Sequence, residues 1–279
     1  MNEYLHIAAA LSQATEQLRR VSESPRLDAE LLLARALDVP RSYLFAHPED
    51  LLDPAAAVRF GANVARRQDG VPLAYITGEK EFWSMTLMVS PATLVPRAES
   101  EVLVEHALNL IPEDEKFQVL DLGTGSGAIA LAIAKERFNC QVTATDAYAD
   151  ALAVAQQNAR QLELSNITFL RGNWIEAVHD RTFDLIVTNP PYVPDKDPHL
   201  ERLKHEPLAA LASGADGLDA IRHIAREARK VLREGHYLLL EHGDNQQHDV
   251  ADMLQRAGWH DIDCLEDLAG LPRVTLARR

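Results

Sequence analysis

The spacing of hydrophobic residues changes along the chain, and its first quarter has a helical period. Apolar positions recur every three to four residues there, with charged residues between them. Pro25 suits a first helical turn, and Asp53 followed by Pro54 is a typical N-cap and first-turn pair. We therefore predict helices over residues 5–18, 25–37, 41–45 and 54–68, which would form a small helical bundle.

The pattern becomes partly alternating between residues 79 and 90. The apolar residues Phe82, Trp83, Met85, Leu87 and Val89 partly alternate with polar ones, which predicts a β-hairpin or a pair of short strands. Pro96 then precedes another helix with apolar residues at helical spacing. We accordingly divide the chain into a helical domain at 1–75, a hairpin linker at 76–95 and a larger domain at 96–279.

From residue 117 onward, strand and helix patterns alternate. We predict strands at 117–121, 141–145, 167–171, 183–187 and 236–241, and helices at 127–137, 148–163, 215–233 and 246–257. This order predicts an α/β fold with a doubly wound, mostly parallel sheet and helices on both faces. The last strands, at 260–265 and 273–277, have too little chain between them for a helical crossover, so we expect them to pair antiparallel.

A glycine-rich loop connects the first strand of this domain to its helix. Gly123, Gly125 and Ala128 fit the dinucleotide fingerprint, which is a weak signal when it stands alone. Asp121, two residues before Gly123, would repel a pyrophosphate but can accept hydrogen bonds from a ligand amine. Gly127 adds a third glycine at two-residue spacing. These features favour a cofactor other than NAD.

Polar residues also follow the next two strands. Asp146 ends the second strand, where a carboxylate suits the hydroxyls of a ribose; a helix N-cap before Tyr148 is the alternative. The ribose is common to NAD and S-adenosylmethionine, so Asp146 does not identify the cofactor. Asn173 and Trp174 follow the third strand and could face an adenine ring, although a tryptophan that only packs in the core is an equal interpretation.

The sequence Asn189-Pro190-Pro191-Tyr192 follows the buried strand at 183–187. The two prolines end the strand because each lacks an N–H and fixes its own φ. An amide and an aromatic ring are thereby expected on a stiff turn at the edge of the sheet where ligands bind. A plain turn with Asn189 capping backbone groups is the alternative.

The loop, Asp146 and this turn together resemble the class I S-adenosylmethionine-dependent methyltransferases that act on a planar amide-like nitrogen. The turn alone is shared with the adenine-N6 and cytosine-N4 nucleic acid methyltransferases. Five further segments resemble the peptide chain release factor glutamine methyltransferases (the HemK/PrmC family), so that the resemblance covers nearly the whole chain. These segments are residues 72–79, 81–83, 89–97, 205–211 and 239–243.

This resemblance implies a Rossmann-like methyltransferase fold, a helical N-terminal domain that docks the protein substrate, and methylation of N5 of the glutamine in the Gly-Gly-Gln motif of release factors. S-adenosylmethionine would be the donor and S-adenosylhomocysteine the product. The cofactor would be bound by Asp121, Gly123, Thr124, Gly125, Ser126, Gly127, Asp146, Asn173, Trp174 and Asn189. The glutamine would be bound by Asn189, Pro190, Pro191 and Tyr192.

Catalysis is assigned to Asn189, Pro190 and Tyr192. The Asn189 side-chain oxygen and the Pro190 carbonyl would accept hydrogen bonds from the glutamine NH₂, and Tyr192 would offer its ring face. Two positions depart from the family pattern. Ala98 stands where proline is common, and Asn173 stands where aspartate is common.

Charge and cysteine content narrow the remaining alternatives. The net charge of −14 argues against a general affinity for nucleic acid, which disfavours an adenine-N6 methyltransferase that uses the same turn. The two cysteines have no metal-ligand or disulfide spacing, so we expect no metal site and a reducing compartment. We find neither a signal peptide pattern nor a membrane span. We expect a cytoplasmic monomer without membrane or stable nucleic acid binding; a cofactor-sensing protein without turnover is the other alternative.

Overall fold

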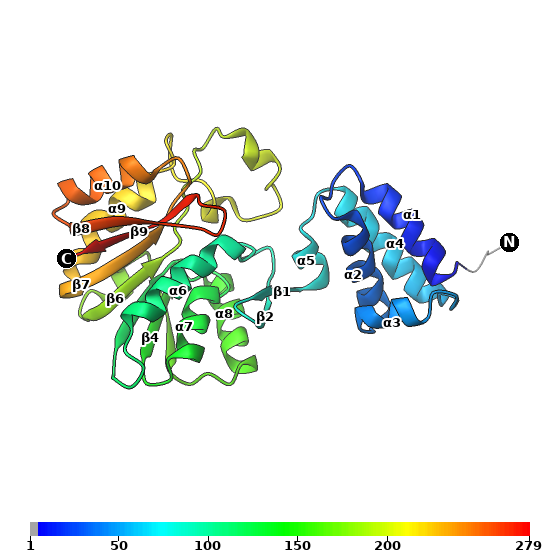
Figure 1. Cartoon of the computed structure of the whole chain (residues 1–279), viewed down its shortest axis with the longest axis horizontal. Helices are drawn as coiled ribbons and strands as arrows, with labels where there is room; N and C mark the ends of the chain where they lie inside the picture. The colour runs from blue at the N-terminus through cyan, green and yellow to red at the C-terminus, as the bar shows by residue number, and fades with distance from the viewer. Residues whose placement is uncertain (1–4) are drawn as a thin grey trace. The chain divides into compact units, whose positions relative to one another are not determined.

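The computed structural model describes residues 5–279, which form two compact units divided between Glu79 and Lys80 (Figure 1). Residues 1–4 of the predicted N-terminal domain lie outside the described residues. Among residues 5–279, no helix combines the length and the apolar character that crossing a membrane requires.

The first unit is helical. It contains α1 (Ile7–Leu18), α2 (Pro25–Leu37), α3 (Arg41–Ala46), α4 (Pro54–Gln68) and α5 (Leu73–Thr77). Asp53 caps α4 as expected, because its carboxylate accepts hydrogen bonds from the backbone N–H groups of Ala55 and Ala56. The prediction missed α5, which is only five residues long.

A hairpin opens the second unit. Strands β1 (Glu79–Phe82) and β2 (Met85–Met88) pair with each other, and their turn residues Trp83 and Ser84 both have positive φ. Asn158 in α8 (Ala149–Gln161) fastens this hairpin to the sheet domain. Its side chain accepts a hydrogen bond from the Met88 N–H at 2.7 Å and donates to the carbonyl oxygens of Met88 and Ser126.

Within the described residues, seven strands form one sheet in the order β5-β4-β3-β6-β7-β9-β8. Strands β3 to β7 are parallel, and β9 pairs antiparallel with both β7 and β8, as predicted for the C-terminal strands. The order reverses between β3 and β6, which creates the switch point where open sheets bind ligands. The strands are β3 (Gln118–Leu122), β4 (Gln141–Asp146), β5 (Ile167–Arg171), β6 (Phe183–Thr188), β7 (Leu232–Glu241), β8 (His260–Glu266) and β9 (Pro272–Arg278).

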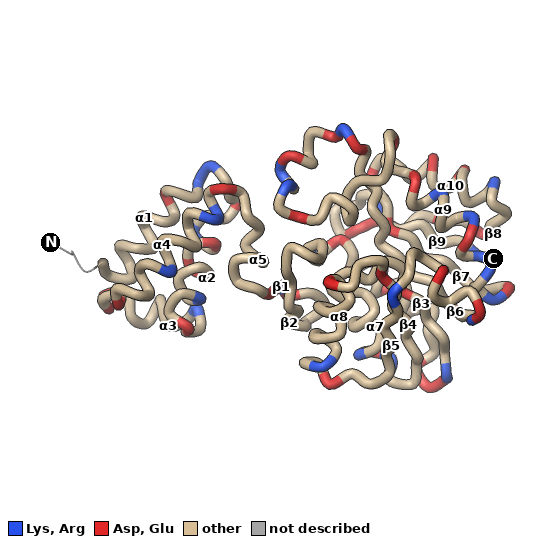
Figure 2. Tube along the Cα trace, turned by 180° about the vertical axis from the view of Figure 1, so that it is seen from behind, with Lys and Arg blue, Asp and Glu red and all other residues tan. Residues whose placement is uncertain are grey.

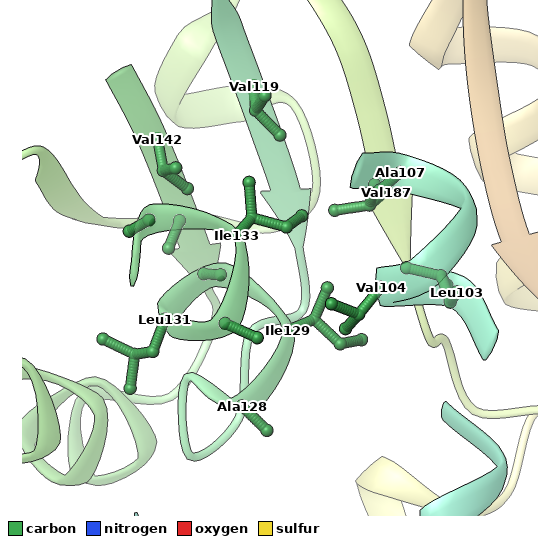
Figure 3. Packing of buried hydrophobic residues seen from close by; sticks show 14 of the residues in the cluster. Leu103, Val104, Ala107, Val119, Ala128, Ile129, Leu131, Ile133, Val142 and Val187 are labelled. Atoms are coloured by element: carbon green, nitrogen blue, oxygen red, sulfur yellow. The ribbon is translucent and has the colours of Figure 1, made fainter. Parts of the chain in front are cut away.

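Helices cover both faces of the sheet because successive strand residues point to opposite sides. On one face, α6 (Glu101–Leu110) and α7 (Ala128–Glu136) pack in a core cluster with Val119 of β3 and Val142 of β4; Figure 3 shows Ile133 of α7 among them. On the other face, Leu120 of β3 belongs to a second cluster with α9 (Asp219–Glu227) and α10 (Gln247–Arg256). Short 3₁₀ turns complete the chain at Ala98–Ser100, Glu176–Val178, Pro198–Glu201, Leu208–Ala210 and Ala228–Lys230.

The prediction of one helix over 215–233 was wrong at both ends. Gly217 has a φ of +79°, which delays the start of α9 until Asp219. At the other end, β7 already begins at the buried Leu232 instead of at residue 236. The spacing of apolar residues alone does not show at which residue a helix ends and the next strand begins.

Candidate functional site

A cavity of about 370 Å³ lies in the second unit, at the carboxyl ends of β3, β4, β5 and β6. This is the sheet edge that the sequence indicated. Nine of the residues expected in the site line the cavity: Gly123, Thr124, Gly125, Ser126, Asp146, Asn173, Trp174, Asn189 and Pro191. Four others do not line it: Asp121, Gly127, Pro190 and Tyr192.

The glycine loop folds back along the end of β4. The backbone N–H groups of Gly123 and Thr124 both donate to the Thr145 carbonyl at 2.9 Å, and the Gly127 N–H donates to the Thr124 carbonyl at 2.8 Å. Gly127 has a φ of +87°, and a Cβ at this position would lie 2.9 Å from Cδ1 of Leu131. Gly127 therefore allows the loop to pack on α7, and it contributes to the cavity only through the loop's shape.

Asp121 is buried behind the loop, with 1% of its surface exposed. Its Oδ2 accepts a hydrogen bond from the Thr124 hydroxyl at 2.6 Å, while its Oδ1 has no partner within the described part of the chain. Burial raises the pKa of Asp121 to about 7, the Thr124 bond opposes this rise, and the nearby Asp146 adds to it. Asp121 thus supports Thr124 from behind the loop.

Asp146 combines a structural role with a place on the cavity wall. Its Oδ2 accepts from the Gly125 N–H and its Oδ1 from the Tyr148 N–H, both at 2.9 Å. The alternative of a helix N-cap was wrong, because Tyr148 is the N-cap of α8 and Asp146 accepts from the N–H of that cap residue. A carboxylate has about four acceptor positions, so two remain for the hydroxyl groups of a ligand.

Trp174 lies between the core and the cavity. Its backbone takes the left-handed conformation at a φ of +51°, and a Cβ on Gly123 would lie 3.4 Å from its ring. The ring also packs against the core cluster that contains Leu120. Trp174 therefore packs against the core and lines the cavity at the same time. Asn173 next to it lines the cavity as well.

The turn after β6 places its asparagine on the cavity wall. Every residue of β6 is buried, and the Thr188 hydroxyl donates to the Leu122 carbonyl at 2.8 Å, which joins the ends of β6 and β3. The Asn189 side-chain nitrogen donates to the Ser100 hydroxyl oxygen at 3.0 Å. This bond uses the NH₂ of Asn189 and leaves its oxygen available as an acceptor.

Tyr192 does not face the cavity as we expected. Its hydroxyl donates to Oε1 of Glu241 at 3.3 Å, and its ring packs against the second core cluster. The buried carboxyl at the end of β7 therefore directs the tyrosine inward. Burial and the neighbouring Glu241 raise the pKa of Tyr192, so its hydroxyl stays protonated.

Sequence reasoning missed Glu241 and Ser100 as members of this site. Glu241 is 1% exposed, and burial raises its pKa to about 7, while hydrogen bonds from Ser100 and Tyr192 oppose the rise. Its position in the sequence was the available signal, since Glu241 ends a buried strand just as Asp146 does. The Ser100 hydroxyl has no comparable signal in the sequence.

A third missed residue, Glu206, fixes the segment that covers one side of the cavity. Its carboxylate accepts hydrogen bonds from the Val95 N–H at 3.0 Å and from the Arg97 guanidinium at 2.5 Å. Pro207 and Ala210, which follow it, line the cavity. This buried carboxylate thus joins the long segment after β6 to the chain before α6.

The cavity wall offers hydrogen-bond acceptors, backbone donors and an aromatic ring, and the described residues that line it include neither histidine nor cysteine. Such a wall can orient an uncharged nucleophile beside a bound cofactor. Lys and Arg are interspersed with Asp and Glu along both units in Figure 2, and the net charge of the chain is −14. The surface charge therefore gives no support to a nucleic acid substrate.

Two family models match the chain. Residues 9–78 match the PrmC N-terminal domain, and residues 113–266 match a methyltransferase domain. The chain is 50% identical over 275 residues to the release factor glutamine methyltransferase of Coxiella burnetii, with 99% of each chain covered. It is 44% identical over 278 residues to the release factor glutamine methyltransferase of Escherichia coli K12, again with 99% of each covered.

A solved structure shares the fold. The crystal structure of a methyltransferase from Pyrococcus furiosus aligns with a TM-score of 0.53 at 21% identity, covering 70% of this chain and 88% of that one. At this identity the likeness concerns the sheet and its helices alone.

Proposed function

The chain belongs to the release factor glutamine methyltransferase family, and from this premise we propose how its cavity performs the reaction. The protein is a methyltransferase that acts on a glutamine of release factors. We propose that the methylated atom is N5 of the glutamine in the Gly-Gly-Gln motif, that S-adenosylmethionine is the donor, and that S-adenosylhomocysteine leaves as the product.

The residues on the wall fit S-adenosylmethionine. Asp146 retains acceptor capacity for ribose hydroxyls, and Trp174 with Asn173 offers a ring and an amide to adenine. The Oδ1 of Asp121, without a partner among the described residues, suits the amine of the methionine part. When bound, S-adenosylmethionine supplies an electrophilic methyl group.

The protein's own contribution is the placement of the glutamine. An amide nitrogen is a weak nucleophile because its lone pair is delocalised into the carbonyl. The Asn189 Oδ1 and the Pro190 carbonyl would each accept a hydrogen bond from the glutamine NH₂, which fixes the nitrogen and increases its electron density. Placement of this kind can lower a barrier by roughly 7–11 kcal/mol in favourable cases. We propose that Tyr192 contributes by fixing the turn through Glu241.

One observation carries the proposal. The Asn189 amide lies on the wall of the same cavity as the glycine loop and Asp146, with its NH₂ bonded to Ser100. The acceptor oxygen of Asn189 and most of the residues proposed to bind the cofactor therefore line one cavity of the second unit. Because all these residues belong to one chain, we propose that the monomer is the working form. We propose that the first unit docks the release factor, as the PrmC N-terminal match supports.

The variant Asn189→Ala tests this proposal. Methyl transfer to a release factor should fall by at least about 10²–10³-fold, as when one preorganised hydrogen-bonding group is removed from an active site. S-adenosylmethionine binding, measured by calorimetry, should weaken only modestly. Asn109→Ala, which changes an exposed asparagine on α6, is the matched control and should behave as the wild type.

The same assay distinguishes the alternatives. Tritiated S-adenosylmethionine is incubated with the protein and either a release factor or adenine-rich nucleic acid. Label on nucleic acid alone would show that the turn serves a nucleic acid methyltransferase. No label on either would favour a protein that binds the cofactor without turnover.

A further inference from the structure

Four polar side chains form a connected set behind the cavity wall. Asn189 donates its side-chain N–H to the Ser100 oxygen at 3.0 Å, and the Tyr192 hydroxyl donates to Glu241 at 3.3 Å. The Ser100 hydroxyl also acts on Glu241 as a hydrogen-bond donor that lowers the pKa of this carboxyl, while Oε2 of Glu241 has no hydrogen-bond partner among the described residues. Ser100 and Glu241 are 3% and 1% exposed, so water does not compete for these contacts. The set thus connects the turn after β6, the start of α6 and the end of β7.

An asparagine amide can occupy its site in two orientations that differ by exchange of its oxygen and nitrogen. Only one orientation presents the oxygen of Asn189 to the cavity. The other would present an NH₂ to the NH₂ of a substrate glutamine, and two donors cannot bond to each other. Activity therefore requires something that selects one orientation.

The Ser100 hydroxyl can make this selection because it carries a single hydrogen. A carboxylate accepts hydrogen bonds and does not donate them. When the Ser100 hydroxyl directs its hydrogen to Glu241, the Ser100 oxygen can only accept a hydrogen bond from Asn189. The group of Asn189 that faces Ser100 must then be the NH₂. The oxygen of Asn189 then faces the cavity.

We propose that Ser100 is a positioning residue for the methyl transfer, and that it fixes the Asn189 amide with its oxygen toward the substrate while Glu241 sets the direction of the Ser100 hydroxyl. The inference rests on the proposed function, since it concerns how the glutamine acceptor is oriented. The ionised form of Glu241 strengthens the selection, because both Ser100 and Tyr192 must then donate to it. The bonds from Ser100 and Tyr192 and the charge of Arg273 favour that form, whereas burial and Glu99 disfavour it.

The test compares Ser100→Thr with Ser100→Val, which have nearly the same volume and differ in the hydroxyl. Ser100→Thr should keep most of the turnover, and Ser100→Val should lose about tenfold to a hundredfold in kcat, as expected for one removed hydrogen bond to a buried group. Ser100→Ala, which adds no volume, should lose a similar factor. The affinity of Ser100→Ala for S-adenosylmethionine should match that of the wild type.

The outcomes separate this inference from the proposed function. If Asn189→Ala is inactive while Ser100→Ala turns over normally, Ser100 does not position the amide and the inference fails alone. If Asn189→Ala itself turns over normally, the assignment of the glutamine site fails first. Equal losses in Ser100→Thr and Ser100→Val would also contradict the inference, because the effect would then follow volume and not the hydroxyl.

Discussion

The buried carboxyl of Glu241 should make the stability of the second unit depend on pH. Glu241 is 1% exposed at the end of β7, and burial raises its pKa from 4.5 to about 7. The variant Glu241→Gln keeps the size of the side chain and its ability to accept hydrogen bonds, but it removes the titration. Comparison of the two proteins at each pH cancels the contributions of all other groups.

The magnitude follows from the two pKa values. Because the folded protein holds the proton more tightly than the unfolded chain, the stabilising contribution is complete below about pH 4.5 and is lost as the pH rises through about 7. One pKa unit corresponds to 1.36 kcal/mol, so the full loss is about 3 kcal/mol. Between about pH 5 and about pH 8, the free energy of unfolding of Glu241→Gln should therefore rise relative to the wild type by about 2–3 kcal/mol.

Urea unfolding followed by tryptophan fluorescence measures this difference for the second unit alone. All three tryptophans, Trp83, Trp174 and Trp259, lie after residue 79, so the first unit does not contribute to the signal. Glu234→Gln, at an exposed position of the same strand, is the control and should show no comparable trend. A difference between Glu241→Gln and the wild type that stays constant with pH would refute the reasoning.

Two further changes test the glycine loop and the carboxylate of Asp146 beside it. Asp146→Asn should weaken S-adenosylmethionine binding by about tenfold or more in calorimetry, because an amide cannot accept every hydrogen bond of this carboxylate; unchanged binding would exclude its ribose role. Gly127→Ala should lower the free energy of unfolding of the second unit by about 1–3 kcal/mol, because its φ is +87° and the new Cβ would lie 2.9 Å from Leu131. Gly61→Ala in α4, where a Cβ meets no atom of the described residues within 4 Å, should instead stabilise the first unit by about 0.5–1 kcal/mol in a thermal melt followed by circular dichroism. A stabilised Gly127→Ala, or a destabilised Gly61→Ala, would contradict the local geometry.

The hydrophobic pattern predicted the sheet and its ligand edge because both follow from local sequence. The strands of the second unit are short apolar runs between turn signals, and parallel strands place their carboxyl ends together. Asp146 and Asn189 each stand directly after such a run or at its end, which is why both could be located at the cavity before the fold was known.

The orientation of individual side chains could not be predicted, because it depends on distant partners. Tyr192 turns inward because its hydroxyl bonds to Glu241, 49 residues away in the sequence. Asn189 is oriented by Ser100, which lies 89 residues before it. Asp121 lies behind Thr124 and does not line the cavity, because β3 carries it into the core before the loop begins. Each of these contacts exists only after the sheet has formed.

The most direct test of the central claim is mass spectrometry of a release factor after incubation with the protein and S-adenosylmethionine. The account predicts the mass gain of one methyl group, localised by fragmentation to the side chain of the glutamine in the Gly-Gly-Gln motif, and its absence with Asn189→Ala. An unmodified glutamine, or a methyl group on another residue of the release factor, would contradict it.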